Sequence, residues 1–126
     1  MNIGLIGLGA MGGAYAKHLI TNNFNCYGID LDKKNISRFL NLGGSEITYT
    51  NLFNKVDVVL LSLPSLEAYK NVLENLKKLG KHTSNKIILD MNTISIEDKI
   101  DFKNEIKKFN IDTVSYTHLR AHETSD

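Results

Sequence analysis

Three glycines near the start of the chain have a spacing suited to binding phosphate groups. They follow the apolar run Ile3–Ile6 in the pattern G-x-G-x-x-G, and small or apolar residues recur at helical spacing after them. In a strand–turn–helix unit, the first glycine makes a tight turn, the second lets a pyrophosphate approach the backbone, and the third lets helix and strand pack closely. The alternative is a glycine-rich turn that binds no ligand. The pattern predicts dinucleotide binding at a helix N-terminus, by Gly7, Leu8, Gly9, Ala10, Met11 and Gly12.

An acidic residue follows at the distance that this kind of site requires. Asp30 ends a second predicted strand, Phe24–Ile29, about 20 residues past the glycines, where a dinucleotide fold places the group that binds the adenosine ribose. A carboxylate accepts hydrogen bonds from the ribose hydroxyls and repels a 2′-phosphate, so Asp30 favours NAD over NADP. Lys33 and Lys34 could neutralise such a phosphate, although a solvated helix face suits them better. Asp30 could instead be a turn or helix N-cap residue.

The rest of the chain alternates between apolar runs and amphipathic segments. Val56–Leu63 and Lys86–Met91 are almost continuously apolar, as expected of strands covered on both faces of a parallel sheet. Helices are expected after the capping residues Asp32 and Ser95, and over Leu66–Leu79. We also expect a short strand at Glu46–Tyr49, a helical turn at Asn51–Lys55 and a last strand from Asn110. The alternation predicts an α/β fold with a doubly wound parallel sheet, a Rossmann fold.

Composition narrows the class of protein. The 126 residues carry a formal net charge of +1, which gives no basic field for nucleic acid or a membrane surface. No apolar run approaches the ~20 residues of a membrane span, and no charged leader precedes the first strand. Cys26 is the only cysteine and lies in an apolar stretch, so we expect a buried, unreactive thiol and a cytoplasmic protein.

Three separated motifs together resemble the β-hydroxyacid dehydrogenases, which include 3-hydroxyisobutyrate dehydrogenase and the cofactor domain of 6-phosphogluconate dehydrogenase. They are the segment Gly4–Gly12, the Leu63–Pro64 turn, and the sequence Asp-Met-Asn-Thr-Ile-Ser at 90–95. The resemblance implies that Leu63, Pro64 and Thr93 approach the nicotinamide half of the cofactor. Two positions depart from the family: Asn92 stands where it has serine, and Ile96 where it has proline.

The resemblance also implies a function for a parent protein. It would be a homo-oligomer that binds NAD, or less favourably NADP, and oxidises a small, 3-hydroxyisobutyrate-like hydroxy acid by hydride transfer. The family's substrate loop and catalytic lysine come after the segments found here, so we assign no catalytic residue to this chain and expect it to be inactive alone. The alternative is a free-standing NAD-binding sensor that performs no catalysis.

The C-terminal segment is different in character. Val114–Thr124 matches one reading frame of a common transposase-type sequencing adapter. We therefore expect residues 1–112 to be an incomplete NAD(P)-binding domain and residues 113–126 to be a non-native tail. His118 and His122 have a spacing that could suit a metal-binding helix, but as part of such a tail they predict no metal site.

Overall fold

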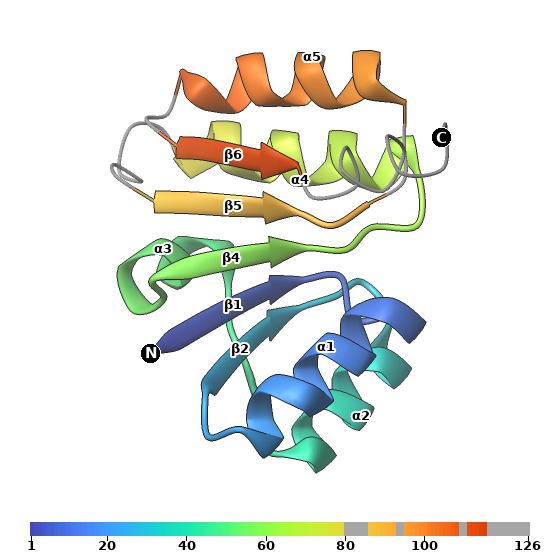
Figure 1. The fold of residues 1–126 in the computed structure, drawn as a ribbon, viewed down its shortest axis with the longest axis vertical. Coiled ribbons are helices and arrows are strands. Elements are labelled where there is room, and N and C mark those ends of the chain that lie inside the picture. Colours follow the sequence, from blue (N-terminus) through green and yellow to red (C-terminus); the bar gives the residue numbers. More distant parts are fainter. Residues whose placement is uncertain (80–85, 93–94, 109–110, 116–126) are drawn as a thin grey trace, which may run out of the picture.

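The computed structural model describes residues 1–79, 86–92, 95–108 and 111–115, and these form one α/β layered structure (Figure 1). The strands are β1 (Asn2–Ile6), β2 (Asn25–Ile29), β3 (Ser45–Glu46), β4 (Val58–Leu61), β5 (Lys86–Asp90) and β6 (Ile111–Ser115). The helices are α1 (Ala10–Thr21), α2 (Lys33–Leu42), α3 (Tyr49–Lys55), α4 (Leu66–Leu79) and α5 (Ile96–Lys107).

The strands form one parallel sheet in the order β3-β2-β1-β4-β5-β6. The chain runs outward from β1 to β3 and then returns to place β4 on the other side of β1. The order therefore reverses between β1 and β4. In open parallel sheets, this switch point is where the loops at the carboxyl edge separate and leave a crevice for a ligand. The predicted doubly wound α/β fold is confirmed.

Helices cover both faces of the sheet. Figure 1 shows α1 and α2 together beside β1 and β2, and α4 and α5 together beside β5 and β6. One apolar cluster joins the first pair of helices to the sheet, and it includes Leu5, Ala16 and Phe39. The other cluster lies on the opposite face, where Val59 and Ile106 are both fully buried. Burial on both faces explains why the central strands are apolar without alternation.

Local signals set the starts of two helices as predicted, whereas β4 is shorter than the predicted Val56–Leu63 strand. The Asp32 side chain accepts a 2.9 Å hydrogen bond from the Lys34 amide and caps α2, and Ser95 caps α5 in the same way. Cys26 is 4% exposed, and burial raises the pKa of its thiol. Across the ranges given above, no helix combines the length and apolarity needed to cross a bilayer.

The segment around β3 differs from the prediction. We expected a strand over Glu46–Tyr49, but the strand is Ser45–Glu46 and Tyr49 already begins α3. The Ile47 amide donates to the Gly28 carbonyl oxygen, so pairing with β2 continues one residue beyond β3. Leu52 and Phe53 in α3 then become buried beneath the sheet. The apolar core thus favours a longer helix than the local sequence indicates.

Candidate functional site

The strand register aligns the last residues of four strands in one row. Ile29 of β2, Ile6 of β1, Leu61 of β4 and Asp90 of β5 are successive partners across the sheet. The residues that follow these four strands therefore meet at the carboxyl edge. This edge brings together Asp30, the glycine turn (Gly7–Gly12), the Leu63–Pro64 turn and Asn92. Gly7 and Asn92 are 85 residues apart in the sequence.

Two glycines of the turn are required by close backbone packing. Gly7 has φ +96°, and a Cβ there would lie 1.9 Å from the carbonyl oxygen of Ser62. A Cβ on Gly12 would lie 2.0 Å from the carbonyl oxygen of Gly7. No side chain heavier than hydrogen fits at either position, so these glycines let the ends of β1, β4 and α1 approach one another.

Gly9 is different because, among the described residues beyond its chain neighbours, none crowds the position that a side chain would take. A Cβ on Gly9 would meet no atom within 4 Å, and its φ of −66° is one that any residue adopts. Gly9 is the N-cap residue of α1, where no side chain caps the helix and the first turn holds no acidic residue. The N–H groups at this end of α1 thus have no capping side chain, which leaves them available to an anionic group.

A cleft of about 870 Å³ opens at this edge, within the size range of cofactor sites. The predicted site residues that line it are Gly7, Gly9, Ala10, Met11, Gly12, Asp30, Leu63 and Pro64. Leu8 lies beneath the cleft, with a side chain 2% exposed in the core that contains Phe39. Thr93 falls outside the described residues.

The Asp30 carboxylate is held by the protein on both oxygens. Oδ2 accepts hydrogen bonds from the Leu8 amide at 2.7 Å and from Asn35 Nδ2 at 3.2 Å, and Oδ1 accepts from the Asp32 amide at 2.7 Å. These bonds give Asp30 a structural role in the turn, while Asp32 is the helix cap. A carboxylate has about four lone-pair positions, so Asp30 also retains capacity to accept from a ligand in the cleft.

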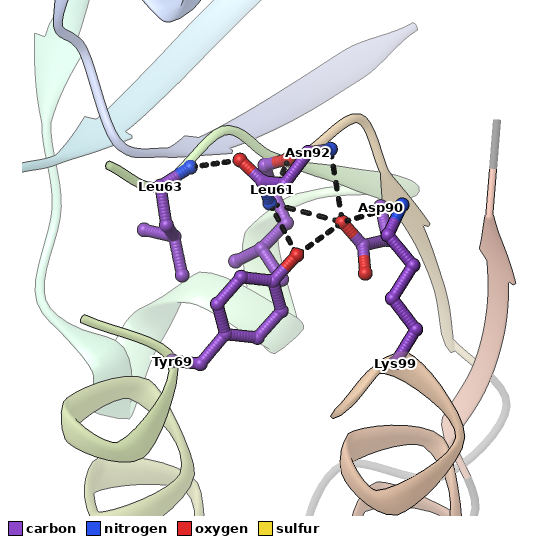
Figure 2. A network of polar contacts seen from close by, with 6 residues as sticks. All are labelled: Leu61, Leu63, Tyr69, Asp90, Asn92 and Lys99. Carbon is purple, nitrogen blue, oxygen red and sulfur yellow. Dashed lines mark hydrogen bonds and ion pairs between the residues drawn. The ribbon is translucent and has the colours of Figure 1, made fainter. Parts of the chain in front are cut away.

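Asn92 links the ends of β4 and β5 through its side chain (Figure 2). Its Oδ1 accepts from the Leu63 amide, and its Nδ2 donates to the Leu61 carbonyl oxygen at 3.1 Å, to the Tyr69 hydroxyl at 2.7 Å and to Asp90 Oδ1 at 2.9 Å. The Tyr69 hydroxyl in turn donates to Asp90 Oδ1 at 2.5 Å. We call these residues, with Lys99, the Asn92 network.

The sequence indicated Asn92 only as a departure from the family, and it indicated Tyr69 only as part of the predicted helix over Leu66–Leu79. Two signals were available. An Asp-x-Asn sequence directly after a buried strand favours side-chain bonds to the local backbone, and a buried tyrosine normally requires a partner for its hydroxyl.

The Asn92 network contains buried charge. Asp90 is 1% exposed, and Lys99 Nζ lies 3.8 Å from its Oδ1. Burial lowers the pKa of Lys99, and the Asp90 charge opposes that shift. Burial, together with the bond and charge of Asp90, raises the pKa of Tyr69, so the phenol stays protonated. Among the described residues, Asp90 Oδ2 is a buried oxygen with no hydrogen-bond partner.

Acidic, histidine and cysteine residues form no metal-binding cluster in the parts of the chain described here. Within those ranges, no group of three or more of these residues could hold a metal ion. His118 and His122 lie outside the described residues.

A parallel sheet of this order, with a glycine turn and an uncapped helix at the switch point, defines a dinucleotide-binding Rossmann domain. The chain belongs to the family of the NAD-binding domain of 6-phosphogluconate dehydrogenase, whose model matches residues 2–116. This match confirms the resemblance to the β-hydroxyacid dehydrogenases, and with it a nicotinamide-cofactor domain of oxidoreductase type.

One sequence relative and two solved structures are similar to this chain, and the two structures show the fold. Over 73 residues, the chain is 37% identical to an L-threonate dehydrogenase from Cupriavidus necator, an alignment that covers 57% of this chain and 25% of the relative. The fold is similar to a Mycobacterium tuberculosis 3-hydroxyisobutyrate dehydrogenase solved with L-serine (TM-score 0.78, 21% identity, 90% of this chain and 39% of that one). It is also similar to an imine reductase from Myxococcus stipitatus in complex with NAD+ (TM-score 0.79, 14% identity, 90% and 39%). The chain thus spans a minor part of the length of these proteins.

Proposed function

We propose that this chain is the cofactor-binding half of an NAD-dependent dehydrogenase that oxidises a small 3-hydroxy acid. The observation that carries the proposal is the open space beside Gly9 at the uncapped N-terminus of α1. A backbone that leaves this space free, in a cleft of dinucleotide size, has the properties that pyrophosphate binding requires. The names of the L-threonate and 3-hydroxyisobutyrate dehydrogenases support a hydroxy-acid substrate.

Each part of the cleft has a role in this proposal. The N–H groups at the N-terminus of α1 bind the pyrophosphate, and Asp30 binds the adenosine ribose and selects against a 2′-phosphate. Leu63, Pro64 and Thr93 contact the nicotinamide half. A bound nicotinamide would supply the hydride-transfer chemistry, and the residues of this chain would hold it in position. The general base is a lysine outside this sequence, and the parent enzyme is a homo-oligomer.

Cofactor binding can be tested on the chain itself. A titration with NAD, followed by nuclear magnetic resonance of the backbone amides, should shift the Gly9 and Ala10 signals first, even if the affinity is weak. ADP-ribose should shift the same two signals, because it carries the same pyrophosphate. Unchanged Gly9 and Ala10 signals at saturating NAD would refute the proposed binding site.

The reaction requires the parent protein. An independent clone of the gene should encode a longer protein that reduces NAD in the presence of 3-hydroxyisobutyrate, L-threonate or a similar hydroxy acid. The 126-residue chain should bind cofactor weakly and turn over none of these compounds. A parent protein that binds NAD and oxidises no hydroxy acid would instead support the sensor alternative.

A further inference from the structure

Asn92 occupies the point where the Leu63–Pro64 turn meets the end of β5 (Figure 2). We propose that Asn92 is a positioning residue that fixes this turn for the nicotinamide half of the cofactor and has no comparable effect on the adenosine half. The inference rests on the proposed function, and it assigns a specific task to a residue at which this sequence departs from its family.

The backbone around the turn explains why a side chain is needed there. Pairing with the last residue of β4 continues one step past the end of β5, because the Met91 amide donates to the Leu61 carbonyl oxygen at 3.0 Å. The Ser62 amide donates to Ile6 of β1, so Leu63 is the next residue after β4 whose amide is left for the β5 side, and Pro64 has no N–H. Asn92 Oδ1 accepts from the Leu63 amide where a further strand residue would otherwise do so. The side chain thus extends the sheet by one hydrogen bond into the cleft.

The orientation of the Asn92 amide is determined by its neighbours. Nδ2 faces the Leu61 carbonyl oxygen, Asp90 Oδ1 and the Tyr69 hydroxyl oxygen, all of which accept hydrogen bonds. The Tyr69 hydroxyl gives its own hydrogen to Asp90. Reversing the amide would place Oδ1 against the Asp90 carboxylate and the NH₂ group against the Leu63 N–H. Only the observed orientation satisfies these groups, so Oδ1 is held toward the turn.

The adenosine side of the cleft is fixed by separate contacts. The Asp30 carboxylate is held by Leu8, Asp32 and Asn35, which belong to the β1–β2 side of the site. The Asn92 network joins β4, α4, β5 and α5 on the other side. Loss of Asn92 should therefore affect a ligand with a nicotinamide ring more than one that lacks the ring.

The test compares NAD with ADP-ribose, which lacks nicotinamide, by calorimetric titration of the 126-residue chain and its Asn92→Ala variant. The substitution should weaken NAD binding by about two- to tenfold, the range of one hydrogen bond, while ADP-ribose affinity stays within error. Asn92→Ser, which restores the residue of the family and a shorter hydroxyl, should recover part of the NAD affinity. Equal loss for both ligands, or no loss for either, would overturn the inference.

Two further variants separate positioning from folding. Tyr69→Phe keeps the ring, which packs edge-on against Phe102 at 4.9 Å between centroids, and removes the hydroxyl that orients Asn92. It should reduce the preference for NAD over ADP-ribose in the same direction even if Asn92→Ala fails to fold. Ile106→Val loosens the same side of the core without touching the cleft, and it should leave the preference for NAD over ADP-ribose unchanged. If Ile106→Val changed this preference as much as Tyr69→Phe does, the inference would be contradicted. A wild-type chain that binds neither ligand would refute the proposed function itself.

Discussion

The backbone amide of Leu8 donates a 2.7 Å hydrogen bond to Oδ2 of Asp30. This bond joins the glycine turn to the end of β2 across 22 positions of the chain. Asp30, which we propose to bind the cofactor ribose, is therefore also part of the scaffold of the proposed phosphate site. Substitutions at Asp30 should change both stability and cofactor preference, and the two effects can be measured separately.

Replacing Asp30 with alanine should narrow the difference in affinity between NAD and NADP by about 1 kcal/mol or more, because a charge-assisted bond to the ribose and the repulsion of a 2′-phosphate are both lost. The same variant should lose about 1–3 kcal/mol of unfolding free energy with its backbone bonds. Titrations with both cofactors and urea denaturation measure the two effects. Asp57→Ala is the matched control, since Asp57 accepts a 2.9 Å bond from the Asn2 amide away from the cleft. An unchanged NAD to NADP ratio in folded Asp30→Ala would disprove the assignment.

The glycines of the turn should separate into two classes. Gly9→Val should abolish NAD binding and leave the fold largely intact, because the side chain enters the open space assigned to the pyrophosphate. Gly12→Ala should instead destabilise the fold, since its Cβ would lie 2.0 Å from the Gly7 carbonyl oxygen. Gly13→Ala is a control for both, because its Cβ would meet only the Leu8 carbonyl oxygen at an ordinary 3.5 Å. Near-normal NAD affinity in a folded Gly9→Val variant, measured by calorimetry, would exclude this binding mode.

Removing only one charge of the buried Asp90–Lys99 pair should lower the free energy of unfolding strongly. Lys99→Met leaves the Asp90 carboxylate in the core without its nearby cation and should cost about 3–5 kcal/mol of unfolding free energy. Adding Asp90→Asn to that variant should recover much of the loss, because the uncompensated charge is removed. Chemical denaturation of both single variants and the double variant gives the coupling energy. Additive losses would show that the two residues do not act as a pair.

The Tyr49 hydroxyl should make the free energy of unfolding decrease as the pH becomes alkaline. Burial raises its pKa from 10.0 to about 12, so the folded state favours the neutral phenol. Its contribution is complete below pH 10.0, and it is lost as the pH rises to about 12, because the unfolded chain releases the proton first. At about 1.4 kcal/mol per pKa unit, the loss is at most about 3 kcal/mol.

The measurement is the difference in unfolding free energy between wild type and Tyr49→Phe across this pH window. Subtracting the variant removes the parallel contribution of Tyr69 and the opposite one of Lys99, whose charged form burial disfavours. Tyr49→Phe should lose less stability than wild type as the pH rises. Identical slopes for the two proteins would contradict the burial of this hydroxyl.

Residues 114–126 should contribute little to stability. Val114 pairs with Leu89 at the end of the sheet order, but its side chain remains 53% exposed. Deleting 114–126 should shift the Tm by less than about 4 °C, which corresponds to at most about 1 kcal/mol. Deleting 111–126 removes the whole of β6 and should lower the Tm clearly. A loss from the shorter deletion that equals the loss from the longer one would show that the segment belongs to the domain.

The sequence by itself determined the parts of this protein that depend on local spacing. The glycine pattern after an apolar run predicted the turn at Gly7–Gly12, and the position of Asp30 predicted an acid at the end of β2. Continuous apolar runs predicted strands covered on both faces. Glycine spacing and runs of apolar residues are patterns within short segments of the chain, so the sequence carries this information without knowledge of long-range contacts.

The tertiary structure alone decided which distant groups meet. Local alternation predicts a doubly wound parallel sheet but not the register of its strands, and this register brings the Leu63 amide to Asn92, 29 positions away. The bond from Leu8 to Asp30 and the orphaned oxygen of Asp90 depend on the same arrangement. Hydrogen bonds between side chains and remote backbone groups form only after the core has fixed strand order and register, and residue type and spacing along the chain do not specify their partners.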